Sequence, residues 1–104
     1  MKGSLFLLLN RNNCVIKQIT VYNEGIAGTI VDPKLVFKHA LDHLASCIIL
    51  SHNHPSGNLK PSSPDIELTK KLVAAGNHLD IKVLVHIIVS SQGYYSFLDE
   101  GLIS

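Results

Sequence analysis

Residues 47–54 read Cys-Ile-Ile-Leu-Ser-His-Asn-His, a short apolar run that ends in polar residues. The apolar part, residues 47–50, predicts a central β-strand that is covered on both faces. His52 and His54 would then lie at the C-terminal end of this strand. Because only one residue separates them, both imidazoles can project the same way and offer a nitrogen to one metal ion.

Turn and capping residues divide the rest of the chain into further strands and helices. The pairs Asp32-Pro33 and Ser63-Pro64 are typical helix starts. The predicted elements are strands at residues 5–9 and 15–22, a helix from Pro33 to about Ala45, the strand at residues 47–50, a helix from Ser63 to near Gly76, and strands at residues 81–89 and 94–97. This order, ββαβαββ, predicts a single α/β domain over residues 1–104, with a mixed β-sheet flanked by helices.

The first predicted helix has an apolar face. Apolar residues recur along it at steps of three and four, which is the spacing of one helix face. They are Val36, Phe37, Ala40, Leu41 and Leu44. We expect all of them to pack against the sheet.

Length and composition restrict the class of protein. With 104 residues, of which 46% are hydrophobic, the chain can form one compact core. No apolar stretch approaches the roughly 20 residues that cross a bilayer, and the apolar N-terminal run is too short for a signal peptide. We therefore expect a soluble, cytoplasmic protein without a membrane partner.

Charge and cysteine content argue against two other classes. Nine Lys and Arg against eight Asp and Glu leave a net charge of +1, which is too small for a dedicated DNA-binding surface. Cys14 and Cys47 lie far apart and form no CxxC pair, so neither a disulfide framework nor a cysteine zinc site is indicated. We expect both thiols to be reduced and buried.

Asp65 is the third candidate metal ligand. It falls in the first turn of the second predicted helix, where exposed N–H groups favour a negative charge. Together with His52 and His54, it would leave the fourth position of a tetrahedral zinc site open for water. Zinc lowers the pKa of such a water to roughly 7, which makes hydroxide available at neutral pH. The predicted chemistry is hydrolysis.

Ser62 lies three residues before Asp65, at the boundary between loop and helix. Its hydroxyl is a candidate for stabilising the oxyanion that forms when hydroxide attacks a carbonyl. The alternative is that Ser62 or Ser63 only caps the helix, because serine before proline is a common helix start.

These residues resemble a known motif. Residues 52–57 read HNHPSG and are followed by Pro61-Ser62 and Asp65, which is similar to the H-x-H-x7-S-x2-D core of the JAMM (JAB/MPN+) metalloproteases in its RadC form. The similarity continues to residues 100–103 and covers nearly the whole chain.

The resemblance implies a cytidine deaminase-like (JAB/MPN) fold with Zn²⁺ held by His52, His54 and Asp65. It also implies a water that an upstream glutamate activates, and a protein or peptide substrate with an amide or isopeptide bond. RadC-like proteins are traditionally labelled as DNA repair proteins, a role that the charge of this chain supports little.

The chain departs from the RadC pattern at the general base. The family keeps a glutamate just before the first strand, whereas residues 1–4 read MKGS. Glu24, in a glycine-flanked loop, is an alternative base, although a solvated loop carboxylate is the simpler explanation of it. We attribute the missing glutamate to truncation at the amino terminus or to a start-site variant.

A second departure lies in the strand at residues 81–89. Where the family has Asp-His, this chain has Val85-His86. In an apolar strand, His86 is expected to be a hydrogen-bonded core histidine. The alternative is that it supports a metal ligand by contacting it.

Two rival functions remain open at the level of the sequence. One is a non-catalytic JAMM-like module that binds a partner, which the missing glutamate favours. The other is a metal-dependent DNA-repair nuclease, although two-metal nucleases usually need more carboxylates. The first hairpin strand would be an unprotected edge, so a homodimer formed by strand pairing is a further expectation.

Overall fold

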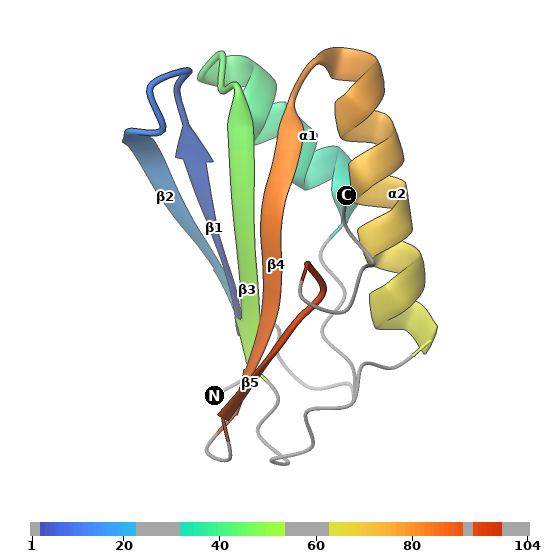
Figure 1. Cartoon of the computed structure of the whole chain (residues 1–104). Helices are drawn as coiled ribbons and strands as arrows, with labels where there is room; N and C mark the ends of the chain where they lie inside the picture. Colours follow the sequence, from blue (N-terminus) through green and yellow to red (C-terminus); the bar gives the residue numbers. More distant parts are fainter. Residues whose placement is uncertain (1–2, 23–31, 54–62, 91–92, 99–104) are drawn as a thin grey trace.

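The strands and helices follow one another in the order that the sequence predicts. The computed structural model describes residues 3–22, 32–53, 63–90 and 93–98. Within these ranges the elements are β1 (Gly3–Leu9), β2 (Val15–Tyr22), α1 (Pro33–Asp42), β3 (Cys47–Asn53), α2 (Ser63–Leu79), β4 (Lys82–Ser90) and β5 (Gly93–Ser96) (Figure 1). The prediction of an α/β domain with the order ββαβαββ is confirmed.

The strands form one mixed sheet in the order β2-β1-β3-β4-β5. β3 and β4 are parallel and are connected through α2, whereas the other neighbouring strands are antiparallel. β1 lies between β2 and β3, so the expectation that it is an edge strand is wrong. In the described part of the sheet, the edges are β2 and β5.

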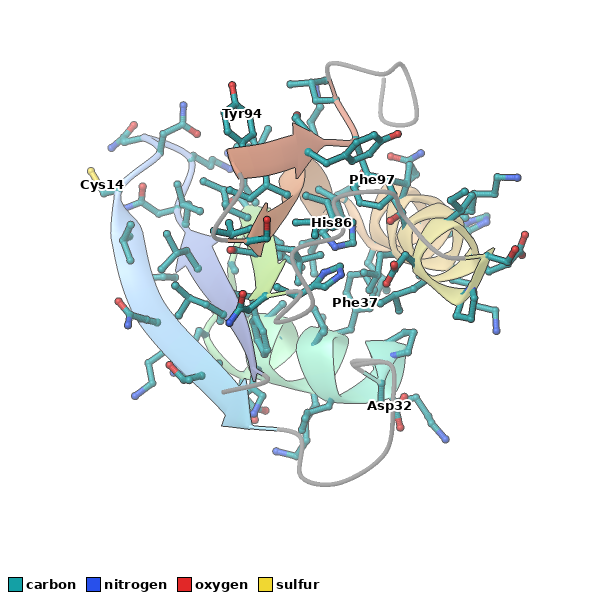
Figure 2. All side chains as sticks on the ribbon, turned by 90° about the horizontal axis from the view of Figure 1, so that it is seen from below. Cys14, Asp32, Phe37, His86, Tyr94 and Phe97 are labelled. Carbon is teal, nitrogen blue, oxygen red and sulfur yellow. The ribbon has the colours of Figure 1, made fainter. Side chains whose placement is uncertain are left out.

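The helices cover one face of the sheet (Figure 2). Along β3 the side chains alternate between buried and half-buried, and Ile48, Leu50 and His52 are the buried ones. The expectation that this strand is covered on both faces is therefore wrong. Because both helices lie on one face of the sheet, the side chains of Cys47 and Ile49 on the other face are only half-buried, even within the apolar run.

The core lies between the sheet and the two helices. It contains apolar side chains from the three strands β1, β3 and β4, from both helices and from the segment after β5. They include Phe6, Leu8, Val36, Phe37, Ala40, Ile48, Leu50, Leu68, Leu72, Val83, Ile88 and Phe97. α2 packs beside β4 in this core, and its first turn lies next to the end of β3.

α1 begins as predicted but ends earlier. The Asp32 side chain caps it by accepting a hydrogen bond from the Lys34 backbone N–H at 2.9 Å. After Asp42 the backbone turns into the left-handed region at Leu44, with φ 50°, and Ala45 N–H donates to the Ala40 carbonyl oxygen at 2.9 Å. This Schellman-type end stops the helix before Ala45.

The early end of α1 changes which residues join the core. Val36, Phe37 and Ala40 are buried, as expected. Leu41 is 49% exposed and Leu44 is 85% exposed, so the prediction that they pack on the sheet is wrong. Leu44 lies beyond the end of the helix, and Leu41 lies in its last turn.

α2 ends at Leu79, beyond the predicted end near Gly76. Asp80 adopts the left-handed conformation with φ 56°, and Ile81 N–H donates to the Gly76 carbonyl oxygen at 2.8 Å. Gly76 therefore does not supply the left-handed position that ends the helix. It lies inside the helix, where the backbone of Ile81 passes close to it.

Two further expectations concern the surface. Cys14 is exposed and Cys47 is half-buried, so the prediction that both are buried is wrong; both thiols are free. Cys14 belongs to the turn of the hairpin, which explains its exposure. Among the described residues, no helix is long and apolar enough to cross a membrane.

Candidate metal centre

His52 and Asp65 meet at one end of the sheet. His52 lies near the C-terminal end of β3, and Asp65 lies in the first turn of the helix that follows. In α/β sheets, ligands bind outside the carboxyl ends of parallel strands, where such loops and helix starts converge. His52 Nε2 lies 3.2 Å from Asp65 Oδ1, and both residues are 4% exposed.

This pair of atoms fits the ligand set of a zinc ion. Zinc binds imidazole nitrogen and carboxylate oxygen at about 2.0–2.2 Å, so two ligands of a tetrahedral ion are about 3.3 Å apart. The separation of Nε2 and Oδ1 is close to this distance. The first turn of α2 also suits a negatively charged ligand, because its exposed backbone N–H groups favour an anion.

Three other candidate site residues lie outside the described part of the chain, namely His54, Ser62 and Glu24. Their roles stay predictions. In the ranges that the structure describes, no group of three His, Cys, Asp or Glu side chains is placed to hold a metal ion. The pair of His52 and Asp65 therefore carries the structural argument for a metal site.

His86 lies next to this pair. Its Nε2 is 3.0 Å from Nδ1 of His52, and its Nδ1 is 2.7 Å from Oγ1 of Thr69. Its ring stacks on that of Phe97, with the ring centroids 4.3 Å apart and the planes at 11° (Figure 2). His86 is thus a buried, hydrogen-bonded core histidine and also a direct neighbour of a candidate ligand, so its two sequence interpretations do not exclude each other.

Thr69 lies beside the candidate site, and no role is predicted for it from the sequence. Its hydroxyl donates to the Asp65 carbonyl oxygen at 2.9 Å, and the side chain is buried. The signal that could have identified it is its position four residues after Asp65, on the same face of one helix.

The environment of His86 favours its neutral form. Burial in the core lowers the pKa of His86 from 6.5 to about 3, because the charged imidazolium loses its hydration. The nearby His52 lowers this pKa further, whereas Asp65 acts in the opposite direction. At neutral pH, His86 therefore has one N–H donor and one nitrogen lone pair.

This lowered pKa predicts a loss of stability in mild acid. Between about pH 6.5 and about pH 3 the unfolded chain binds a proton at His86 that the folded protein does not, so acid favours unfolding in this window. The free energy of unfolding should fall by up to about 1.4 kcal/mol per pH unit from this residue. Urea unfolding of the metal-free protein at several pH values measures the slope.

Two variants separate His86 from the other titrating groups. His86→Gln should reduce the slope by nearly one proton, and His78→Gln, at an exposed position of α2, is the control for replacing a histidine as such. An equal slope in wild type and His86→Gln would show that His86 titrates normally.

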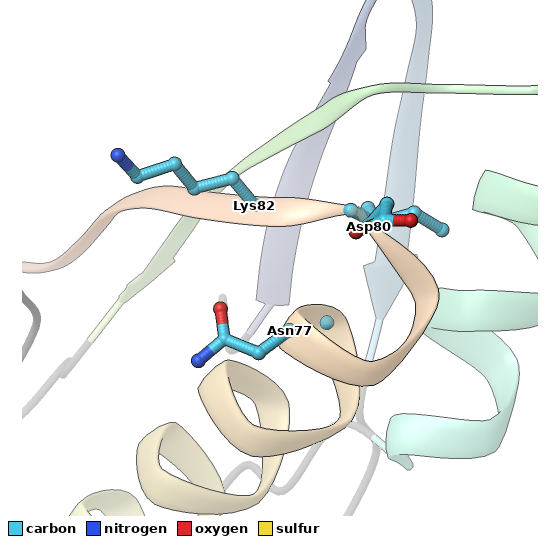
Figure 3. A pocket seen from close by; sticks show the side chains of 5 residues that line it. Asn77, Asp80 and Lys82 are labelled. Carbon is cyan, nitrogen blue, oxygen red and sulfur yellow. The ribbon is translucent and has the colours of Figure 1, made fainter.

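A shallow hollow occurs at the other end of α2 (Figure 3). Its lining consists of Gly76, Asn77, Asp80, Ile81 and Lys82. Gly76 follows Asp65 by eleven residues along the helix, which corresponds to about 16 Å. The polar side chains of the lining are exposed, so this hollow lacks the buried donor atoms that characterise the pair of His52 and Asp65.

Comparison with known proteins places the chain in a family. A family model described as "RadC-like JAB domain" matches residues 3–102. A UPF0758 protein of Flavobacterium johnsoniae is 52% identical over 96 residues, which cover 92% of this chain and 42% of that protein. UPF0758 proteins of Staphylococcus haemolyticus and Porphyromonas gingivalis are 45% and 42% identical, over 91% and 93% of this chain.

The chain spans less than half of these relatives, 42% to 43% of their length. The family match itself extends over almost all of this chain, from β1 to beyond β5. The chain therefore belongs to the RadC-like JAB domain family.

Proposed function

We propose that this domain is a zinc-dependent metallohydrolase that cleaves an amide or isopeptide bond in a protein or peptide. The observation that carries the proposal is the buried pair of His52 Nε2 and Asp65 Oδ1, 3.2 Å apart at the C-terminal end of β3. The type of bond comes from the resemblance to JAMM metalloproteases, because the pair alone does not distinguish amides from other substrates.

Each residue has a defined task in this proposal. His52, His54 and Asp65 would hold the zinc ion, which supplies a water of lowered pKa when bound. Ser62 would donate its hydroxyl to the oxyanion of the attacked carbonyl. A carboxylate would take the proton of the water, and Glu24 is the candidate within this chain.

Zinc binding tests the proposal. Wild type, stripped with a chelator and dialysed against zinc, should retain about one zinc ion per chain. Asp65→Asn keeps the size of the side chain but removes its charge, and should weaken zinc binding by at least about 100-fold. Equilibrium competition with a chromophoric chelator measures both affinities.

Glu67→Gln provides the matched control, because Glu67 is an exposed residue of the same helix turn. It should bind zinc as wild type does. The metallohydrolase proposal fails if the wild-type protein retains no zinc, or if Asp65→Asn binds zinc as tightly as wild type.

A non-catalytic, partner-binding module is the second candidate function. It is favoured by Val85, which stands in place of the family's aspartate. Tight zinc binding without hydrolysis of any peptide would favour this module. A nuclease role in DNA repair receives less support, because the net charge is only +1.

A further inference from the structure

The face of the sheet opposite α1 and α2 is apolar in its centre (Figure 2). Two rows of half-buried side chains cross β1, β3 and β4 on this face. They are Leu7, Ile49 and Val85 in one row and Leu5, Ser51 and Ile87 in the next. Phe6, Leu50 and His86 alternate with them along the strands and are buried on the helix side. We call the side that carries the two rows the open face.

The apolar centre of the open face is unusual for a sheet that helices cover on one side. The other side of such a sheet commonly carries polar residues, whereas strands that are apolar on both faces are typically covered on both. Val89, which is 39% exposed, and Tyr94, which is 65% exposed, lie opposite each other on β4 and β5 and extend the apolar surface. A contiguous apolar surface of this kind marks an interaction site.

The charge of the open face favours an uncharged partner. Neither row contains a charged side chain, and at β2 the rows continue to Gln18 and Thr20, which are exposed and neutral. Nucleic acids and anionic lipid surfaces attract Lys and Arg, which these rows lack. A neutral apolar surface suits a second copy of itself, because a two-fold axis brings the same patch together from both chains.

The size of the open face is sufficient for a dimer. β1 and β3 have seven residues each, β2 has eight and β4 has nine. With strands about 4.8 Å apart and a rise of about 3.3 Å per residue, these four strands present roughly 500 Å² per copy, before the relief of the side chains is counted. Two copies would bury about 1,000 Å² or more, which is the range where specific interfaces begin.

We propose that the chain forms a homodimer in which the open faces of two copies pack against each other, as the sheets of a β-sandwich do. The apolar residues 47–50, which predict a strand covered on both faces, are then covered on the second face by the partner. The inference does not rest on the proposed function, because His52 and Asp65 meet on the helix side of the sheet.

Sedimentation equilibrium of the metal-free chain tests the proposal. From about 1 μM to about 200 μM, a range in which weak and moderate complexes dissociate, the mass should rise from that of one chain toward that of two. Ile87→Glu places a carboxylate in the centre of the open face and should raise the dissociation constant at least about 100-fold, because the interface would bury an unpaired charge. Leu41→Glu is the matched control on α1, where the leucine is 49% exposed, and should dimerise as wild type does.

The wild-type measurement decides first. A chain that stays monomeric at about 200 μM overturns the proposal. A dimer that Ile87→Glu leaves as stable as wild type also overturns it, because pairing through the β2 edge would not respond to a charge on β4. Circular dichroism shows whether Ile87→Glu folds. If it does not, Val89→Glu takes its place, since the more exposed position accepts a charge in the monomer, and it should weaken the dimer by about 10-fold.

Discussion

Gly76→Ala is expected to destabilise the protein by roughly 2–4 kcal/mol, which is a large part of the stability of a small domain. A Cβ atom at this position would lie 2.2 Å from the backbone carbonyl oxygen of Ile81, well inside van der Waals contact. The chain cannot easily move away, because Ile81 N–H is bonded to the Gly76 carbonyl oxygen and the Ile81 side chain is buried. The clash outweighs the gain of about 1 kcal/mol that alanine normally brings to a helix.

Urea unfolding of wild type and variant measures this effect. Asn77→Ala is the control, because it places alanine at the neighbouring, exposed position of the same helix turn. It should change the free energy of unfolding by less than about 1 kcal/mol. A Gly76→Ala protein as stable as wild type would show that the turn after α2 can shift at little cost.

The role of Gly76 could not be predicted from the sequence. Glycine near the end of an apolar helix pattern is typical of a C-terminal cap, and the sequence predicts a helix end there on that basis. The structure uses Asp80 for the left-handed position and Gly76 for a close approach of backbone to backbone. A left-handed helix end and a close backbone approach both favour glycine, and only the three-dimensional path of the chain distinguishes the two.

The order of the elements could be predicted because each one carries a local signal. Caps and prolines mark the helix starts, and apolar runs between turns mark the strands. The covering of the sheet could not be predicted in the same way. A run of four apolar residues in β3 is compatible with one buried face or two, and the number of faces depends on where the helices pack.

The candidate site could be predicted only in part. The spacing of the motif predicts His52 and Asp65 as ligands, because the end of the strand and the start of the helix can both be predicted from the sequence. The contact between Thr69 and His86 depends on side chains from α2 and β4 that meet in space. No local pattern specifies the directions of hydrogen bonds between such distant residues.

The largest expected functional effect is a gain of hydrolysis in Lys2→Glu. The family pattern places its glutamate just before the first strand, and the first residue of β1 is Gly3. β1 runs antiparallel to β3 with Ser4 opposite His52, so the beginning of β1 lies beside the candidate metal centre. A positioned general base contributes typically 10²–10⁴-fold to the rate. We expect Lys2→Glu to increase cleavage of a pool of internally quenched peptides and isopeptides by at least about 100-fold.

Three controls make this result specific to the site. Lys71→Glu makes the same charge change at an exposed position of α2 and should give no gain. Lys2→Gln removes the lysine without adding a carboxylate and should also give none. Lys2→Glu combined with Asp65→Asn should lose the gain, because the carboxylate needs a zinc-bound water to deprotonate.

The outcome also decides between the two candidate functions. Zinc content should be the same in wild type and Lys2→Glu, so that any gain reflects the base and not the metal. If Lys2→Glu binds zinc and still cleaves nothing, the missing glutamate is not what limits hydrolysis, and the partner-binding module becomes the better account. If cleavage appears, Lys2 at the position of the family's glutamate is what limits hydrolysis in this chain, and the metallohydrolase proposal is supported.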